Sequence, residues 1–281
     1  MTVLVKVEDV QKYYTIKKPG VVDGKKVKKQ LVKAVDGVSF TLNVGETIGI
    51  IGESGCGKTT LGRVLVNLEQ ATGGVVTYNG KTAKELLKED RLGFHRFCQM
   101  VFQNPFDTFD PRETIEDILM EPLKIHGIGK SNEERKQLCI EALEEGGLTP
   151  AMQYMARYPH ELSGGQLQRI SIIRAMLLKP KFLVADEPVS MLDVSVRGDI
   201  ITMLQNLTKK EGTSLIFISH DIATTKYISD QIVVMYYGKI VETGKTEEVL
   251  NNPQHDYTKL LINSIASVDP RESKRRKKKD V

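Results

Sequence analysis

The chain has 281 residues, 40% hydrophobic and 27% charged, an ordinary composition for a globular protein with a buried core. No apolar run approaches the roughly 18 residues that a membrane-spanning helix needs, and the N-terminus has no signal-peptide core, so we expect a protein of the cytoplasm. Its three cysteines, Cys56, Cys98 and Cys139, lack paired spacing, which argues against a disulfide framework and a thiolate metal cluster.

The net charge of +4 is unevenly distributed along the chain. Residues 271–280 carry seven basic and two acidic side chains, which leaves the rest of the chain at −1. A basic run of this kind can bind nucleic acid or anionic lipid. Solvated chain ends have the same composition more often, so we expect a disordered basic tail.

The N-terminal part of the chain predicts strands and one phosphate-type loop. Residues 3–10 alternate as a strand does, and strand character resumes over 35–42. Between them, residues 17–33 gather lysines and glycines and predict a surface loop or hairpin tip. A short buried strand at 46–51 then leads through a Gly-rich loop into a predicted helix at 58–68.

The rest of the chain alternates between helical and strand patterns. Residues 94–176 are rich in Glu and Lys at helical spacing, as in 133–145. Buried-strand patterns return at 182–185, 215–218 and 231–235, and helical patterns separate them at 196–210 and 222–228. Strands that alternate with helices indicate an α/β fold around a largely parallel sheet.

Residues 52–59 read Gly-Glu-Ser-Gly-Cys-Gly-Lys-Thr and match the P-loop pattern G-x-x-x-x-G-K-[ST]. In such a loop the glycines let backbone N–H groups point at phosphate, and the helix N-terminus adds positive potential. Lys58 is expected to reach the β- and γ-phosphates, and the Thr59 hydroxyl to hold Mg²⁺. A plain Gly-rich turn is the alternative, but the predicted strand before the loop and helix after it favour nucleotide binding. The predicted binding residues are Gly52, Ser54, Gly55, Cys56, Gly57, Lys58, Thr59 and Thr60.

A second chemical signal is the pair of carboxylates that follows the strand at 182–185. At the carboxyl end of a central strand, Asp186 can reach Mg²⁺ and Glu187 can polarise an attacking water. Many buried strands end in Asp, so the pair alone is a weak signal. Together with the P-loop upstream, it indicates a nucleotide site.

Leu162-Ser163-Gly164-Gly165-Gln166 predicts a Gly-rich turn at the start of a helix. Free N–H groups there form an anion site, although Ser163 would equally serve as an ordinary N-cap. Taken with the other motifs, the sequence resembles the ATP-binding cassette superfamily, whose signature is LSGGQ.

The resemblance implies roles for residues that carry little signal singly. Gln103 matches the Q-loop glutamine that senses Mg²⁺ and the attacking water. Asp193 ends a D-loop written Ser-Met-Leu-Asp, and His220 matches the switch histidine that contacts the γ-phosphate. Tyr14 matches the aromatic residue that stacks on adenine, with Tyr13 as the alternative.

The resemblance thus implies ATP and Mg²⁺ as cofactors and a fold with a P-loop NTPase core, an antiparallel β-subdomain and an inserted α-helical subdomain. It assigns the catalytic residues Glu187, His220, Gln103 and Lys58 and the metal-binding residues Thr59, Gln103 and Asp186. A second ATPase subunit, identical or paralogous, is expected to meet the nucleotide through Ser163, Gly165, Gln166 and Asp193.

Three stretches resemble the oligopeptide and dipeptide importer branch of that superfamily. They are the P-loop sequence at 52–58, the Arg-Tyr-Pro-His-Glu run before the signature, and residues 252–258. The chain departs from that branch at Leu167, Met191 and Asp256, none of them a catalytic group. The implied function is ATP hydrolysis that powers peptide uptake. Oligosaccharide uptake is one alternative, and a soluble cassette ATPase acting on ribosomes or nucleic acid is another, although we expect no nucleic-acid partner.

Such an importer implies two transmembrane permease subunits and an extracellular solute-binding protein as partners. The chain would then lie on the cytoplasmic face of the cell membrane as a peripheral subunit. We expect an ATPase domain over residues 1–250, with the helical subdomain inserted at about 94–176, and a C-terminal extension over 251–281.

Overall fold

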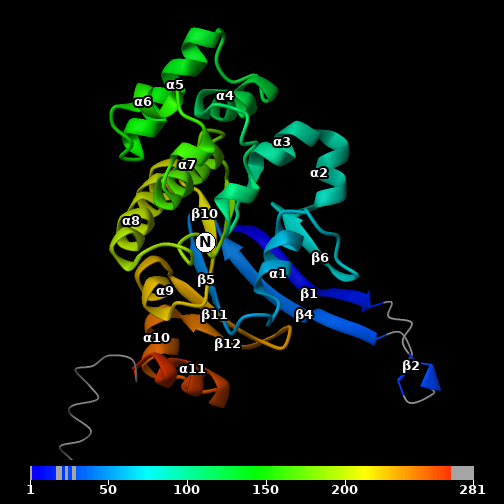
Figure 1. Ribbon diagram of the computed structural model, residues 1–281. Coiled ribbons are helices and arrows are strands. Elements are labelled where there is room, and N and C mark those ends of the chain that lie inside the picture. The colour runs from blue at the N-terminus through cyan, green and yellow to red at the C-terminus, as the bar shows by residue number, and fades with distance from the viewer. Residues whose placement is uncertain (1, 17–20, 23–24, 27–29, 267–281) are drawn as a thin grey trace, which may run out of the picture.

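The computed structural model describes residues 2–16, 21–22, 25–26 and 30–266. The strands of its main sheet are β5 (Thr47–Ile51), β8 (Cys98–Val101), β9 (Phe182–Asp186), β10 (Ser214–Ser219), β11 (Gln231–Tyr236) and β12 (Lys239–Lys245). Their order is β12–β11–β5–β10–β9–β8, and all pairs are parallel except β11 with β12 (Figure 1). The predicted α/β fold with a largely parallel sheet is therefore confirmed.

Helices cover both faces of this sheet, which explains why its central strands are apolar throughout. The helices α1 (Lys58–Leu65), α8 (Val194–Glu211) and α9 (Ile222–Ile228) pack against it. Successive residues of β9 point to opposite faces: Val184 joins the core beneath α1, whereas Leu183 and Ala185 join the core beneath α8. Because helices cover both faces, a ligand can reach this sheet at the ends of its strands.

A second, antiparallel sheet lies beside the first. Its strands are β1 (Val3–Ile16), β4 (Gln30–Asn43), β6 (Gly73–Tyr78) and β7 (Lys81–Thr82), in the order β4–β1–β6–β7, and the helices α2 (Ala83–Glu89) and α3 (Arg91–Phe97) follow it. Val5, Val7 and Leu42 turn inward and share one core with Leu61 and Leu65 of α1. The sheet is the antiparallel β-subdomain of the expected fold.

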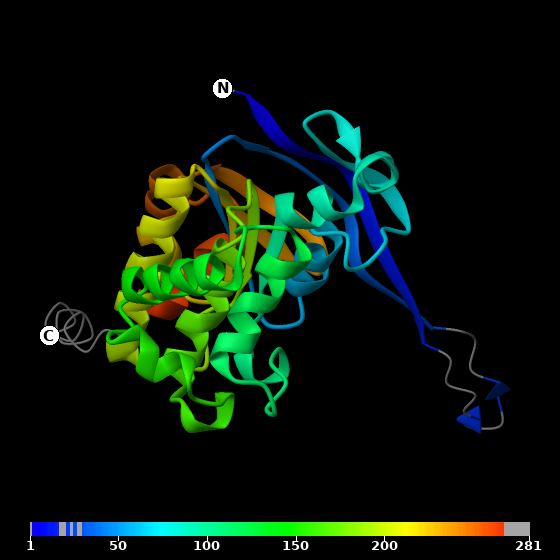
Figure 2. The same ribbon diagram turned by 90° about the horizontal axis from the view of Figure 1, so that it is seen from above.

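The hairpin of β1 and β4 is longer than the sequence predicted, and it extends away from the body of the molecule (Figure 2). Pairing continues past the predicted strand ends, from Tyr13 with Lys33 to Ile16 with Gln30. Backbone pairing therefore extends into the lysine-rich stretch 17–33, for which the sequence predicts a surface loop or hairpin tip. The described residues there also include the short paired strands β2 (Val21–Val22) and β3 (Lys25–Lys26).

The segment after β8 folds into a helical lobe with its own apolar core. Its helices are α4 (Ile115–Ile125), α5 (Asn132–Glu145), α6 (Ala151–Met155) and α7 (Gly164–Met176). Ile115, Leu119, Cys139 and Leu143 are fully buried within the lobe. The range assigned to helices from residue 94 onward nevertheless includes β8, a strand of the main sheet. Because β8 is only four residues long and contains the polar Gln99, it has no pattern that separates it from the end of a helix.

Two helices close the described chain beside β12, at the lower edge of the molecule in Figure 1. They are α10 (Thr246–Asn251) and α11 (Asp256–Ala266), and Val249 and Tyr257 pack with Ile51 and Ile232 of the main sheet. The predicted disordered tail lies outside the described residues. Within those residues, every helix is too short or too polar to cross a bilayer.

Candidate functional site

The P-loop connects β5 to α1 at the carboxyl edge of the main sheet. Gly57 has φ +107°, and a Cβ there would lie 2.0 Å from the carbonyl oxygen of Ala34 in β4. A Cβ on Gly52 would lie 2.2 Å from the carbonyl oxygen of Met235 in β11. Only glycine fits where the loop is pressed between these two strands, so both sheets together shape it.

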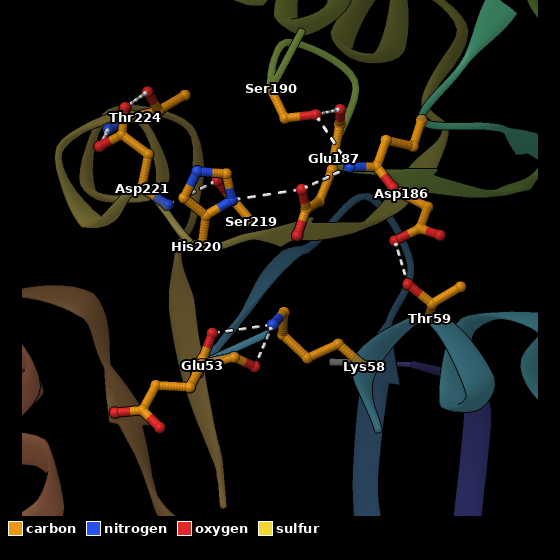
Figure 3. Close-up of polar contacts among 12 residues, drawn as sticks. Glu53, Lys58, Thr59, Asp186, Glu187, Ser190, Ser219, His220, Asp221 and Thr224 are labelled. Atoms are coloured by element: carbon orange, nitrogen blue, oxygen red, sulfur yellow. Dashed lines mark hydrogen bonds and ion pairs between the residues drawn. The ribbon is translucent and has the colours of Figure 1, made fainter. Parts of the chain in front are cut away.

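Lys58 is 4% exposed, and its ammonium group is held inside the curl of the loop. Its Nζ donates hydrogen bonds of 2.8 Å to the carbonyl of Gly52 and 2.9 Å to that of Glu53 (Figure 3). The Cys56 thiol is buried with its Sγ 3.9 Å from Lys58 Nζ, and burial raises the pKa of this thiol. The loop thus holds the Lys58 ammonium at its centre, beside a buried thiol.

Asp186 ends β9 directly opposite the start of α1. The Thr59 hydroxyl donates a 3.0 Å hydrogen bond to Asp186 Oδ1 (Figure 3). Burial raises the pKa of the Asp186 carboxyl, and the neighbouring Glu187 charge adds to this, while the bond from Thr59 opposes it. A buried carboxylate beside a hydroxyl is a pair of hard oxygen ligands suited to Mg²⁺.

Glu187 is the hub of the site. Its Oε2 accepts a 3.0 Å hydrogen bond from Gln103 Nε2 and lies 3.2 Å from His220 Nδ1 (Figure 3). Ser190 bridges Gln103 and Glu187, since its hydroxyl accepts from Gln103 Nε2 at 3.3 Å and donates to the Glu187 carbonyl at 3.0 Å. Three residues that the sequence assigned to catalysis therefore meet at one carboxylate.

A pocket of about 340 Å³ lies over the P-loop. Ser54, Gly55, Gly57, Lys58, Thr59 and Thr60 form its floor, and Gln103 and Glu187 stand on one side. A second pocket of about 470 Å³ adjoins it, and Thr59, Gln103 and Asp186 line that one. The predicted phosphate and metal groups thus face two hollows at the carboxyl edge of the sheet, and Thr59 and Gln103 line both of them.

Some lining residues were missed by the sequence, and Tyr14 does not line the pocket. Val32, Lys33 and Ala34 of β4 line it, as do Tyr237 and Gly238 in the turn between β11 and β12. Tyr14 pairs with Val32 across the hairpin, and its hydroxyl is bonded to Glu69. Tyr237 is 77% exposed. An aromatic residue before glycine in a hairpin turn was the available signal for it.

The signature residues lie elsewhere, at the start of α7. Ser163 and Gln166 form a capping box, with bonds of 3.0 Å and 3.3 Å between each backbone N–H and the other side chain. A Cβ on Gly165 would lie 3.0 Å from Val196 in α8, the helix whose N-cap position Asp193 occupies. Ser163, Gly165, Gln166 and Asp193 are absent from the described lining of the P-loop pocket.

Family models match most of the chain. The ABC transporter model matches residues 35–190, and the model described as "Oligopeptide/dipeptide transporter, C-terminal region" matches residues 241–280. The matched ranges contain the P-loop, the signature, the carboxylate pair and α11. They confirm the resemblance that the sequence motifs indicated.

Individual relatives agree with these models. The putative oligopeptide transport ATP-binding protein YkfD of Bacillus subtilis is 47% identical over 86% of this chain and 73% of its own length. The dipeptide transport ATP-binding protein DppF of Escherichia coli is 41% identical over 95% of this chain and 78% of its own. The dimeric post-hydrolysis structure of the ATP-binding cassette MJ0796 bound to ADP and Pi superposes with a TM-score of 0.74 at 26% identity, over 86% of this chain and 99% of that one. With the P-loop, the carboxylate pair and the signature helix assembled in this order, the chain belongs to the ABC transporter family.

Proposed function

We propose that this chain is the ATP-hydrolysing subunit of an importer that takes up oligopeptides or dipeptides. The observation that carries the proposal is the meeting of Gln103 and His220 at the Glu187 carboxylate, beside a complete P-loop. Relatives named as oligopeptide and dipeptide transport proteins, together with the match over residues 241–280, support peptides as the solute.

The residues fit ATP with Mg²⁺. Lys58 would meet the β- and γ-phosphates, and the Thr59 hydroxyl and the Asp186 carboxylate would hold the ion. The Gln103 amide nitrogen is bonded to Glu187, which leaves its carbonyl oxygen for the ion or for water. When bound, Mg²⁺ supplies positive charge against the phosphates and against Asp186. Glu187 would orient the attacking water and take its proton, while His220 would contact the γ-phosphate.

A second ATPase subunit completes the site in this proposal. Ser163, Gly165, Gln166 and Asp193 lie on α7 and at the start of α8, away from the described lining of the P-loop pocket. They are free to meet the nucleotide held by a second subunit. MJ0796, to which this chain is similar, has been solved as a dimer.

The remaining partners follow from an importer. Two permease subunits would cross the membrane, an extracellular protein would deliver the peptide, and this chain would lie on the cytoplasmic face. Residues 1–250 would form the ATPase domain, and 251–281 a C-terminal extension. Within this ATPase domain, we assign residues 102–176, which follow β8, to the helical subdomain.

Replacing Glu187 with Gln tests the catalytic assignment. Glutamine keeps the size and a hydrogen-bonding oxygen but cannot take a proton from water. Hydrolysis should fall by at least the roughly 10²-fold typical of losing a general base. ATP binding should survive, because Lys58, Thr59 and Asp186 are unchanged, so the variant should accumulate as an ATP-bound dimer. Light scattering with and without Mg-ATP measures this, alone and with any paralogous subunit.

The matched control is Glu248→Gln, which removes a carboxylate on α10 that is 68% exposed and lies outside the P-loop. It should hydrolyse ATP and dissociate as the parent does. Parental hydrolysis by Glu187→Gln, or a monomer under every condition, would show that the role given to Glu187 is wrong.

The solute is tested by uptake. Cells that lack this chain should lose accumulation of a labelled di- or oligopeptide, and expression of the parent chain, but not of Glu187→Gln, should restore it. If these cells take up peptides normally but lose oligosaccharide uptake, the transported solute is an oligosaccharide and not a peptide. Normal uptake of both would count against an importer.

A further inference from the structure

The C-terminal segment reaches the P-loop through one side chain. Tyr257, the second residue of α11, is 8% exposed. Its hydroxyl oxygen accepts a 2.9 Å hydrogen bond from the backbone N–H of Glu53, which is 204 positions away in the sequence. The described segment beyond residue 250 is therefore in direct contact with the nucleotide site.

The contact acts on the peptide unit that holds Lys58. The N–H of Glu53 and the C=O of Gly52 belong to the same peptide bond, which is planar and rigid. Tyr257 accepts from its N–H end, and its C=O end accepts from Lys58 Nζ at 2.8 Å. Fixing one end of the plane fixes the other. Hydrogen bonds in such a chain also polarise one another, so the bond to Tyr257 strengthens the carbonyl as an acceptor for the ammonium.

The ring of Tyr257 supports a second wall of the same pocket. It packs on Tyr236 of β11, with ring centroids 4.1 Å apart. Tyr236 in turn contacts Tyr237, at 4.4 Å, and Tyr237 lines the P-loop pocket. The hydroxyl thus meets the P-loop directly, and the ring is linked to Tyr237 through Tyr236.

Tyr257 is itself held in place from the main sheet. The carboxylate of Glu242 in β12 accepts hydrogen bonds from the backbone N–H groups of Gln254, at 2.8 Å, and His255, at 3.0 Å. His255 Nδ1 then accepts from the N–H of Tyr257 at 3.1 Å. Hydrogen bonds therefore hold the backbone at Gln254, His255 and Tyr257, which gives the Tyr257 hydroxyl a defined position.

We propose that Tyr257 is a positioning residue for the phosphate-binding loop: its hydroxyl orients the Gly52–Glu53 peptide, and that peptide orients the Lys58 ammonium toward the phosphates of ATP. The inference rests on the proposed ATPase function and adds to it a role for the C-terminal segment. The segment sets the affinity of the site for nucleotide from outside the catalytic motifs.

Tyr257→Phe tests this with the loss of one oxygen atom. The ring and its packing remain, but the Glu53 N–H loses its acceptor. The KM for ATP should rise about threefold to tenfold, the range expected for one net hydrogen bond, while kcat stays within about threefold. Lys58 meets the phosphates in the bound state and in the transition state alike, so a small loss of its orientation acts mainly on binding.

Tyr78→Phe is the matched control, since the Tyr78 hydroxyl is also buried and donates a 2.6 Å bond to a backbone carbonyl, that of Leu65. It should lower the melting temperature much as Tyr257→Phe does but leave the KM for ATP unchanged. A parental KM in Tyr257→Phe, or an equal rise in both variants, would overturn the positioning role and leave the ATPase proposal standing. A parent protein that neither binds nor hydrolyses ATP would overturn both.

Discussion

At the residue scale, two consecutive carboxylates have different tasks because their surroundings differ. Asp186 is 3% exposed at the end of β9 and is bonded to Thr59. Glu187 has φ +45°, a left-handed conformation that costs energy for a residue with a side chain. Its N–H donates to the Ile218 carbonyl at 2.9 Å, and its carbonyl accepts from Ser190. These bonds hold the strained turn that aims Glu187 toward Gln103 and His220.

The buried charge of Asp186 should cost stability when no cation is bound. Its pKa is raised by burial, so the folded chain binds a proton more tightly than the unfolded chain. The free energy of unfolding therefore falls as pH rises from the ordinary value of 3.8 through the raised folded-state pKa, and the cost is fully present above both. Asp186→Asn should raise the melting temperature of the nucleotide-free protein at pH 7.

Calorimetry across pH checks this prediction. The difference between Asp186→Asn and the parent should shrink as the pH falls toward 3.8. The extra stabilisation that Mg-ATP gives over ATP alone should be lost in the variant. Asp199→Asn is the control, because it removes a carboxylate that is 76% exposed and weakly paired with Arg169. A lower melting temperature for Asp186→Asn at pH 7 would contradict the assignment.

At the scale of elements, the start of α7 combines a structural task with a proposed functional one. Ser163 and Gln166 satisfy two N–H groups of the first turn through the capping box. Gly165 lets α7 approach α8, since a Cβ there would press on Val196. The structural role of Ser163 as an N-cap is therefore real, and it does not exclude contact with a nucleotide in a second subunit.

Ser163→Ala separates these two tasks. Loss of the cap should lower the free energy of unfolding by about 1 kcal/mol. If Ser163 also meets nucleotide across a dimer, hydrolysis should fall by more than that instability explains, on the order of tenfold or more. Thermal unfolding and steady-state ATPase rates measure the two effects.

The chain offers a matched capping box for comparison. Thr82 caps α2 in the same way, with its hydroxyl bonded to the Glu85 N–H at 3.3 Å. Thr82→Ala should lose similar stability and keep its ATPase rate. If both variants hydrolyse ATP at parental rates, Ser163 is only a cap.

At the scale of the whole molecule, the main sheet carries three attached parts. The antiparallel sheet presses on the P-loop from the Ala34 side, the helical lobe presents α7, and the C-terminal helices reach the P-loop through Tyr257. Residues from the antiparallel sheet, the helical lobe and the C-terminal helices therefore lie at the carboxyl edge of the main sheet or next to it. A change in any of them can act on nucleotide binding.

Truncation after Asp269 tests the basic run at the end of the chain. It removes seven basic and two acidic residues and leaves Tyr257 and α11 intact. ATP hydrolysis should remain within about twofold of the parent, because the contacts to the P-loop are kept. A tenfold drop at moderate salt would show that the run has a role in catalysis. Salt-sensitive binding of the parent to RNA or DNA, lost on truncation, would revive the nucleic-acid alternative.

Much of the fold could be predicted because runs of apolar residues mark its buried strands in the sequence itself. Apolar runs at 182–185 and 215–218 predicted buried strands, and these lie within β9 and β10. The strands β6, β8 and β12 were missed. Each is partly polar or at an edge, so that its place comes from pairing with a neighbour and not from its own residues.

The sequence by itself determined the identity and order of the chemical groups, because the P-loop, the carboxylate pair and the signature are each contiguous and need little beyond their own backbone. Tertiary structure alone decided which groups meet. Gln103, Glu187 and His220 come from separate connections and converge because the parallel strands end at a common edge. Tyr257 reaches Glu53 because β11 and β12 bring the C-terminal segment back beside β5. No local pattern contains that contact, since its two residues become neighbours only when the sheet forms.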